Sequence, residues 1–303
     1  METRVNFTES IKNIKKIDVH NHLNLGMQYA TYKKWAGFEI PDFPRKLNGL
    51  DEMHEIIGKY TRPRCKTSQD VVDLVTMSIK DALSDNVEIL EGSIDISFIG
   101  VFDEDFDKFF NSINDLVEEY RDKIDFRPEL GIGKTFDHEK TSRWAPVCIQ
   151  SGVFKSIDLY GPEVTEGIED FAGLYKLCAK KGLKKKAHVG EFSDAASVKA
   201  FAEFFDLDEI QHGIGAAGDD KVLRFLADKN IRCNVTPCSN VMLGAVKSLK
   251  EHPIRKMMDA GVRVSLGTDD LLFFNRTVSM QMKDLLDEDV LTEAHIRKIL
   301  EER

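Results

Sequence analysis

His20 and His22 are separated by one residue and end a short stretch, residues 17–22, that is typical of a buried β-strand. Side chains two residues apart in a strand point to the same face, so both imidazoles can bind one metal ion. Such a pair also occurs at ordinary polar strand ends, because short motifs have a high false-positive rate. The interpretation as a metal site therefore depends on the residues at the ends of later strands.

Other polar residues occupy equivalent positions farther along the chain. His188 and His212 each end a predicted strand, and Asp269 and Asp270 follow the last one. A single strand-end histidine is more often a hydrogen-bonded core residue, and an aspartate pair after a glycine is more often a turn or a helix cap. Their joint occurrence at the ends of different strands favours one shared site over coincidence.

These residue types indicate a particular metal chemistry. The predicted ligands are His20, His22, His188 and Asp269. A nitrogen-rich set with one position left for water suits a single zinc ion better than magnesium or calcium, and zinc lowers the pKa of bound water from about 15.7 toward about 7. His212 is not needed as a ligand, so we expect it to orient the resulting hydroxide or to take its proton. Glu191, three residues after His188, is placed to pass a proton to the substrate without binding the metal.

The elements that must position these residues alternate regularly along the chain. Apolar runs of strand length are separated by amphipathic stretches at helical spacing. The predicted strands are 17–22, 87–97, 124–130, 153–159, 183–189, 209–212, 231–236 and 262–267. This alternation predicts an α/β fold, a (β/α)8 TIM barrel forming one domain over residues 1–303, with its site at the carboxyl ends of the strands.

Residues 24–68 form a long connection between the first two strands. One helix is predicted there, Asp51–Tyr60, with Met53 and Ile57 on one face, and Ser68 is predicted to cap the next helix. A connection longer than a crossover requires often covers a site, although a surface elaboration is an equally open alternative. The fold prediction takes this segment as a lid on the site.

Composition limits the classes of function. The chain has a formal net charge of −10, with 42% hydrophobic and 31% charged residues, which indicates a globular protein and argues against nucleic-acid binding. Its five cysteines show no paired spacing, which suits a reducing compartment. No signal-like or membrane-spanning apolar stretch is present in the sequence, so we expect a cytoplasmic enzyme with a small-molecule partner and no membrane partner. The oligomeric state stays open.

The run Lys180–Lys186 contains five lysines. Basic residues in the last turn of a helix complement the helix dipole. This run is therefore predicted to be a solvated helix end.

Taken together, the motifs resemble those of the adenosine deaminase family of the amidohydrolase superfamily. The resemblance is dense between residues 153 and 275 and thin between 24 and 150. The motifs that carry it are His20-Asn21-His22-Leu23, Asp158-Leu159-Tyr160-Gly161, His188-Val189-Gly190-Glu191, His212-Gly213, Pro237-Cys238-Ser239-Asn240 and Ser265-Leu266-Gly267-Thr268-Asp269-Asp270.

The resemblance implies zinc-dependent hydrolytic deamination of a 6-aminopurine, with adenosine converted to inosine and ammonia as the leading reaction. Glu191 then protonates N1 of the purine, His212 polarises the attacking water, Asp270 binds N7 and the Gly161 N–H meets N3. The residues implied as catalytic are Glu191, His212 and Asp269, and those implied as substrate-binding are His22, Asn24, Met53, Ile57, Gly161 and Asp270.

One departure from the family concerns the sugar side of the substrate. Asn24 stands where the family's nucleoside deaminases usually have an aspartate that holds the ribose 5′-hydroxyl. A neutral side chain tolerates a 5′-phosphate better than a carboxylate does, because like charges repel at short range. Deamination of adenine, of an N6-substituted adenine or of a nucleoside 5′-phosphate is therefore the alternative.

Two other interpretations are weaker. A hydrolase with two metals would need a lysine at the end of the fourth strand, but Lys155 lies inside the predicted strand. A non-catalytic purine-binding paralogue should have lost Glu191 or a metal ligand, and the sequence retains them.

Overall fold

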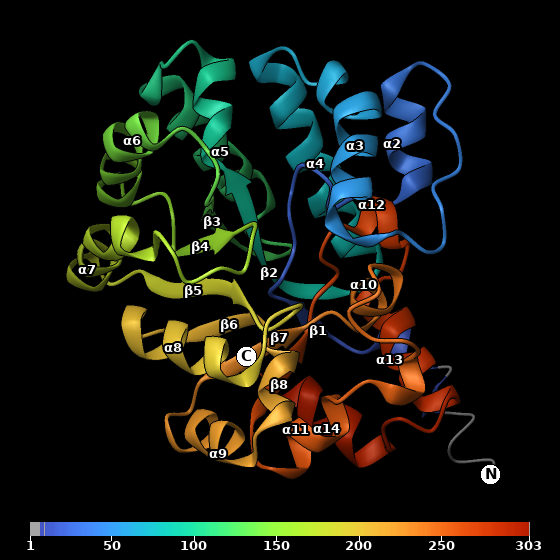
Figure 1. Cartoon of the computed structure of the whole chain (residues 1–303). Coiled ribbons are helices and arrows are strands. Elements are labelled where there is room, and N and C mark those ends of the chain that lie inside the picture. The colour runs from blue at the N-terminus through green and yellow to red at the C-terminus, as the bar shows by residue number, and fades with distance from the viewer. Residues whose placement is uncertain (1–6, 9, 303) are drawn as a thin grey trace.

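Eight parallel strands form one sheet that curls into a nearly closed barrel, with the strands in sequence order from β1 to β8 (Figure 1). The structure, a computed structural model, describes residues 7, 8 and 10–302. The strands are β1 Lys16–Asp18, β2 Val87–Asp95, β3 Asp125–Gly133, β4 Ser156–Tyr160, β5 Lys184–Val189, β6 Glu209–His212, β7 Arg232–Val235 and β8 Arg263–Leu266. The predicted (β/α)8 TIM barrel is confirmed. The single-domain prediction also includes residues 1–6, 9 and 303, which lie outside the described residues.

Helices cover the outside of the barrel (Figure 1). In α5, for example, Phe109, Ile113, Leu116 and Tyr120 recur at helical spacing and are buried against the sheet. The helices of the barrel wall are α4 Ser68–Ser84, α5 Phe106–Tyr120, α6 His138–Gln150, α7 Ala172–Lys181, α8 Ala195–Phe205, α9 Asp220–Asp228, α11 Ile254–Asp259, α13 Val278–Asp287 and α14 Glu293–Glu301. Short α-helices and 3-10 helices complete the fold: α2 Tyr29–Ala36, α3 Gly49–Tyr60, α10 Pro237–Met242, α12 Leu271–Phe274, η1 Ile11–Asn13, η2 Arg62–Arg64, η3 Ile96–Phe102, η4 Ile168–Phe171, η5 Ile214–Gly218 and η6 Leu249–Glu251.

The seam between the first and last strands closes just beyond their ends. The Asp269 N–H donates to the His20 carbonyl at 2.7 Å, which joins the segment after β8 to the segment after β1. A Cβ on Gly267 would lie 2.3 Å from the Cβ of His20, so only glycine allows the two segments to approach this closely. The backbone that closes the barrel therefore also carries two of the predicted metal ligands.

The segment between β1 and β2 lies over the carboxyl ends of the strands. Its helices α2 and α3 pack with α12 in a second hydrophobic cluster that includes Met53, Ile57 and Phe273. Of the two interpretations left open by the sequence, the lid is the one that the structure supports. The predicted helix Asp51–Tyr60 forms and begins at Gly49, whereas α2 was not predicted. Only Tyr32 and Ala36 of α2 are buried, so its sequence shows no clear apolar stripe.

The N-cap of α4 differs by one residue from the prediction. Thr67, rather than Ser68, is the cap, because its side chain accepts from the Asp70 N–H while the Asp70 carboxylate accepts from the Thr67 N–H. This reciprocal pair satisfies two helix-end donors at once.

The prediction for the lysine run is wrong in its second half. Lys184–Val189 is strand β5, and the side chain of Lys186 is fully buried inside the barrel. Its ammonium lies 2.6 Å from Glu91, 2.7 Å from Glu129 and 3.5 Å from Glu209. Strand alternation turns Lys186 inward, where carboxylates from β2, β3 and β6 surround it.

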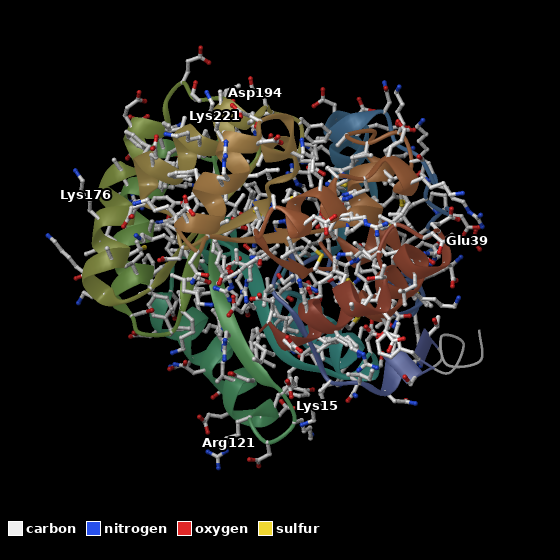
Figure 2. All side chains as sticks on the ribbon, turned by 90° about the horizontal axis from the view of Figure 1, so that it is seen from below. Lys15, Glu39, Arg121, Lys176, Asp194 and Lys221 are labelled. Carbon is white, nitrogen blue, oxygen red and sulfur yellow. The ribbon has the colours of Figure 1, made fainter. Side chains whose placement is uncertain are left out.

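The outer surface carries many charged side chains. Lys15, Arg121 and Lys176 point away from the body of the protein in Figure 2. None of the helices in the described part of the chain is long and apolar enough to cross a membrane.

Candidate active site

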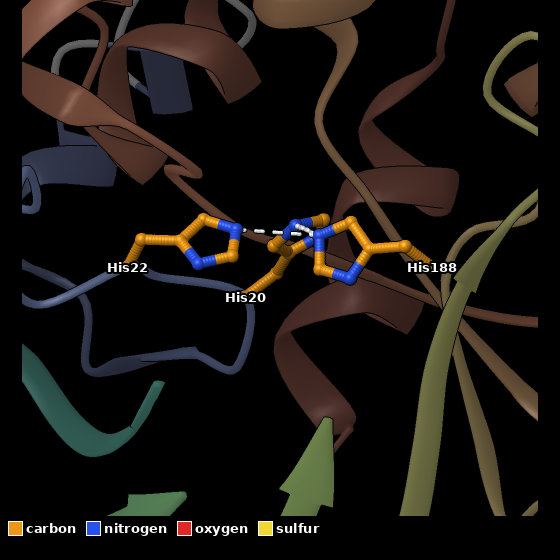
Figure 3. Close-up of side chains that lie close together, drawn as sticks. All are labelled: His20, His22 and His188. Atoms are coloured by element: carbon orange, nitrogen blue, oxygen red, sulfur yellow. Dashed lines mark hydrogen bonds between the residues drawn. The ribbon is translucent and has the colours of Figure 1, made fainter. Parts of the chain in front are cut away.

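Three imidazoles converge at the carboxyl ends of β1 and β5 (Figure 3). The Nε2 atom of His188 lies 3.1 Å from Nε2 of His20 and 3.3 Å from Nε2 of His22. Two ligands that sit about 2.0–2.1 Å from a tetrahedral zinc ion lie about 3.3–3.4 Å apart, so the three nitrogens have the spacing of ligands around one ion.

The carboxylate of Asp269 completes this group from the segment after β8. Its Oδ1 lies 3.9 Å from Nε2 of His20 and 3.7 Å from Nε2 of His22. Asp269 has a φ of 57°, in the left-handed region that non-glycine residues seldom adopt. Such strained backbone persists where surrounding contacts hold it, and it is common at functional sites. We call His20, His22, His188 and Asp269 the histidine cluster.

The hydrogen bonds of Nδ1 show which ring nitrogen carries the proton in His20 and His188. Nδ1 of His20 faces the Asn234 carbonyl at 3.0 Å, and Nδ1 of His188 faces the Asp158 carboxylate at 3.0 Å. An oxygen acceptor on Nδ1 places the proton of the neutral ring there, which leaves Nε2 as an acceptor. Two acceptor nitrogens 3.1 Å apart repel each other unless a cation lies between them. The donor set therefore fits a divalent metal. The other carboxylate oxygen of Asp158, Oδ2, has no hydrogen-bond partner among the described residues.

The charges of the cluster are strongly coupled. Burial, together with the neighbouring imidazoles of His20 and His22, lowers the pKa of His188 well below its usual range. Burial would raise the pKa of Asp269, but the surrounding histidines outweigh it and hold the carboxyl ionised. Burial would lower the pKa of His22, but the carboxylates of Asp270 and Asp269 raise it instead. Neutral rings at His20 and His188 and an ionised carboxyl at Asp269 are the protonation states that metal ligands require.

Glu191 and His212 lie side by side next to the cluster. Oε2 of Glu191 is 3.4 Å from Nε2 of His212, and the Asn240 amide donates to Oε1 of Glu191 at 2.8 Å. Burial, followed by the charges of Asp269 and Glu163, raises the pKa of Glu191 well above its ordinary value. A carboxyl group whose pKa is raised in this way keeps its proton to a higher pH and is therefore better suited to donate it.

A polar network behind His212 fixes its ring. The Ser239 hydroxyl donates to the Thr236 hydroxyl at 2.7 Å, which leaves the Thr236 proton to donate to Nδ1 of His212 at 2.9 Å. The Asn240 amide also approaches Nδ1, at 3.1 Å. Two donors on Nδ1 place the proton of the neutral ring on Nε2, which faces Glu191 and the histidine cluster.

A cavity of about 370 Å³ opens above the cluster and extends under the lid. All of the predicted substrate-binding residues line it: His22, Asn24, Met53, Ile57, Gly161 and Asp270. The cavity walls are apolar at Met53 and Ile57, whereas His54 and Arg62 bring basic groups to the lid side. The Oδ1 atom of Asp270 has no hydrogen-bond partner among the described residues, and burial raises the pKa of this carboxyl to about 7.

Some residues of the site were not assigned a role from the sequence. Asp158 and Asn240 belong to motifs that carried the family resemblance, and the structure shows that they orient His188 and Glu191. Asn234 contacts Nδ1 of His20 through its backbone carbonyl, so its residue type gives no indication of this role. Lys155 precedes β4, rather than lying inside it, and is exposed at the opposite end of the strand from the cluster.

Comparisons with known proteins identify similar sequences and similar folds. The profile of a family described as adenosine deaminase matches residues 53–302. A protein of Treponema pallidum, provisionally named adenosine/adenine deaminase, is 58% identical over 285 residues, which cover 94% of this chain and 95% of that protein.

Two solved structures share the fold. Adenine deaminase from Arthrobacter aurescens superposes with a TM-score of 0.82 at 20% identity, over 95% of this chain and 91% of that one. An amidohydrolase from Burkholderia ambifaria with bound zinc superposes with a TM-score of 0.79 at 18% identity, over 97% and 85% of the two chains.

Proposed function

This chain belongs to the adenosine deaminase family of hydrolytic deaminases, and we propose that it is a zinc enzyme that removes the 6-amino group of a 6-aminopurine. Conversion of adenosine to inosine and ammonia is the leading reaction. The observation that carries the proposal is the convergence of three imidazole nitrogens and one carboxylate beside a carboxyl group of raised pKa, at the base of one cavity.

We assign one zinc ion per chain to His20, His22, His188 and Asp269. The spacing of the Nε2 atoms supports this ligand set, and so do the acceptors on Nδ1 of His20 and His188, which leave Nε2 of these two rings without a proton. When bound, zinc supplies Lewis-acid activation of a water molecule by lowering its pKa. Asp158 and the Asn234 carbonyl hold the rings of His188 and His20 in the tautomer that keeps Nε2 available.

His212 is assigned to orient the attacking oxygen. The sequence left open whether this residue orients the nucleophile or takes its proton. The donors on Nδ1 favour the first role, because a neutral ring with its proton on Nε2 donates a hydrogen bond toward the cavity. The left-handed backbone of His212, with a φ of 65°, aims the ring toward Glu191 and His20.

Glu191 is assigned as the general acid that protonates N1 of the purine. Addition of an oxygen to C6 moves electron density onto N1, so a donor at that atom stabilises the product of the addition. Asn240 holds Oε1 of Glu191 and leaves Oε2 toward the cavity. The hydroxyl proton of the addition product is then transferred to the amino group, the C6–N bond breaks and ammonia leaves, and the C6 oxygen becomes a carbonyl.

The remaining cavity groups are assigned to the purine base. Asp270, whose Oδ1 has no hydrogen-bond partner among the described residues, is assigned to N7, and the backbone N–H of Gly161 to N3. These contacts together with Glu191 involve ring atoms alone. Base recognition is therefore independent of the group on N9.

The group on N9 is where a second candidate function arises. Asn24 is neutral, and Arg62 and His54 line the same cavity from the lid. A basic side chain binds a phosphate group through charge-assisted hydrogen bonds. These residues favour a nucleoside 5′-phosphate as the alternative substrate. Adenine and N6-substituted adenines are further alternatives, because base recognition does not depend on the group on N9.

A substrate panel tests both candidates. Purified, zinc-loaded protein is assayed for ammonia release from adenosine, 2′-deoxyadenosine, adenine, N6-methyladenosine, AMP and a pterin. We expect the highest kcat/KM for adenosine. A preference for AMP supports the second candidate, and no ammonia release from any purine contradicts the proposed function.

A further inference from the structure

The turn that carries Glu191 is held by one carboxylate from a neighbouring loop. Oε2 of Glu163 accepts hydrogen bonds from the backbone N–H groups of Gly190 at 3.1 Å, Phe192 at 3.0 Å and Ser193 at 2.7 Å. Its Oε1 accepts from the N–H of Glu191 at 2.8 Å. Consecutive N–H groups that point at one anion form a nest, and each bond to a charged acceptor is stronger than a neutral one.

The hydrogen bonds to Glu163 hold a turn that is not part of a strand or a helix. β5 ends at Val189 and α8 begins at Ala195, so residues 190–193 take no part in a strand or helix. Phe192 is 46% exposed and gives the turn little apolar anchoring. Gly190 has a φ of 79°, and a Cβ there would lie 2.4 Å from the side chain of Val198, so the start of the turn has little freedom of its own.

The loop that supplies Glu163 is fixed in turn. It follows β4, the strand that pairs with β5, so the two loops are neighbours on the rim of the cavity. The Lys134 ammonium donates to the Pro162 carbonyl at 2.8 Å, next to Glu163. Glu163, Glu191 and Phe192 all line the cavity. The carboxylate thus joins the two loops across the edge of the site.

We propose that Glu163 is a positioning residue for the general acid, which sets the place of Glu191 through the hydrogen bonds to residues 190–193. The proposal rests on the proposed function of Glu191. Asn240 fixes one end of the Glu191 side chain and Glu163 fixes its backbone, so the proton-bearing oxygen has a defined place above the purine site. The negative charge of Glu163 also favours the protonated form of Glu191.

Two variants separate the effects of hydrogen-bond geometry from those of charge. Glu163→Gln keeps the size of the side chain, but its NH2 group must face at least one of the four N–H donors. Glu163→Asp keeps the charge and withdraws both oxygens by one methylene. Glu166→Gln is the matched control, because it makes the same charge change in the same exposed loop.

The zinc-loaded full chain is used for steady-state kinetics with adenosine, adenine and AMP. For both Glu163 variants we expect kcat to fall by about 10- to 100-fold while KM changes by less than about threefold, because a displaced acid weakens the transition state more than substrate binding. Zinc content should not change. Glu166→Gln should match the parent protein in every measurement.

Amide hydrogen exchange gives a readout that does not depend on activity. We expect the amides of residues 190–193 to exchange faster in both Glu163 variants and not in Glu166→Gln. Parent-like exchange and kcat in Glu163→Gln would overturn the proposal, and so would a fully active Glu163→Asp or a loss confined to KM or zinc content. Absence of purine deamination by the parent protein would instead contradict the proposed function, while the exchange experiment would still report on the tether.

Discussion

The barrel encloses two buried polar clusters. One of them contains a cationic side chain, and the other does not. In the histidine cluster, imidazole nitrogens face one another at 3.1 and 3.3 Å and a cavity opens above them. The lysine cluster, which consists of Lys186, Glu91, Glu129 and Glu209, holds its own cation. Burial would lower the pKa of Lys186, but the three glutamates outweigh it and raise the pKa above its ordinary value.

This difference separates a structural role from a chemical one. In the lysine cluster the cation is a side chain of the protein itself, so the carboxylates are balanced without an ion from solution. In the histidine cluster, the chain contributes imidazole nitrogens and a carboxylate but no cation of its own, and this is the donor set that the proposed zinc ion would complete. Both clusters use side chains that point into the barrel from parallel strands, but only the one at the carboxyl ends meets the cavity.

Removing two ligands gives the largest expected effect. The parent protein should bind about one zinc ion per chain, and the double substitution His20→Ala/His22→Ala should abolish both zinc binding and deamination. Elemental analysis and ammonia release measure the two effects. His138→Ala, which changes an exposed histidine, is the control. Parent-like zinc content in the double variant would refute the assigned ligand set.

The lysine cluster should respond in stability. Lys186→Met removes the central cation, leaves buried Glu129 without an ion-pair partner and takes one partner from Glu91 and Glu209, which should lower the free energy of unfolding by about 3–5 kcal/mol. Chemical denaturation measures the change, and Lys199→Met, which breaks an exposed ion pair with Glu203, should cost less than about 1 kcal/mol. Equal losses of unfolding free energy in Lys186→Met and Lys199→Met would contradict the prediction that the buried ion pairs stabilise the fold more than the exposed pair does.

Glu191→Gln tests the chemistry of the site without changing its metal. The amide keeps the shape of the side chain and lacks the acidic proton, so kcat should fall by roughly 100-fold or more. Zinc content should stay at the parent level. A variant with parent-like kcat would show that another group protonates the purine.

Asn24 gives the smallest expected effect. A hydrogen bond to a charged acceptor contributes about 1.5–3 kcal/mol against roughly 0.5–1.5 kcal/mol for a neutral one, so discrimination for a free 5′-hydroxyl should be weak. Adenosine and 5′-deoxyadenosine should then differ by no more than about tenfold in kcat/KM, and Asn24→Asp should increase the preference for adenosine. A difference of about a thousandfold in the parent would mean that another residue binds the ribose.

The alternation of apolar runs was sufficient to predict the barrel, because strand and helix periods are local properties of the sequence. It also placed His20, His22, His188 and Asp269 at strand ends, and parallel strands bring such residues to one rim. Tertiary contacts determined the rest. Lys186 looks solvated among its neighbours, yet its carboxylate partners lie on β2, β3 and β6. The Asn234 carbonyl and the tether from Glu163 likewise depend on backbone groups, whose partners no residue type reveals.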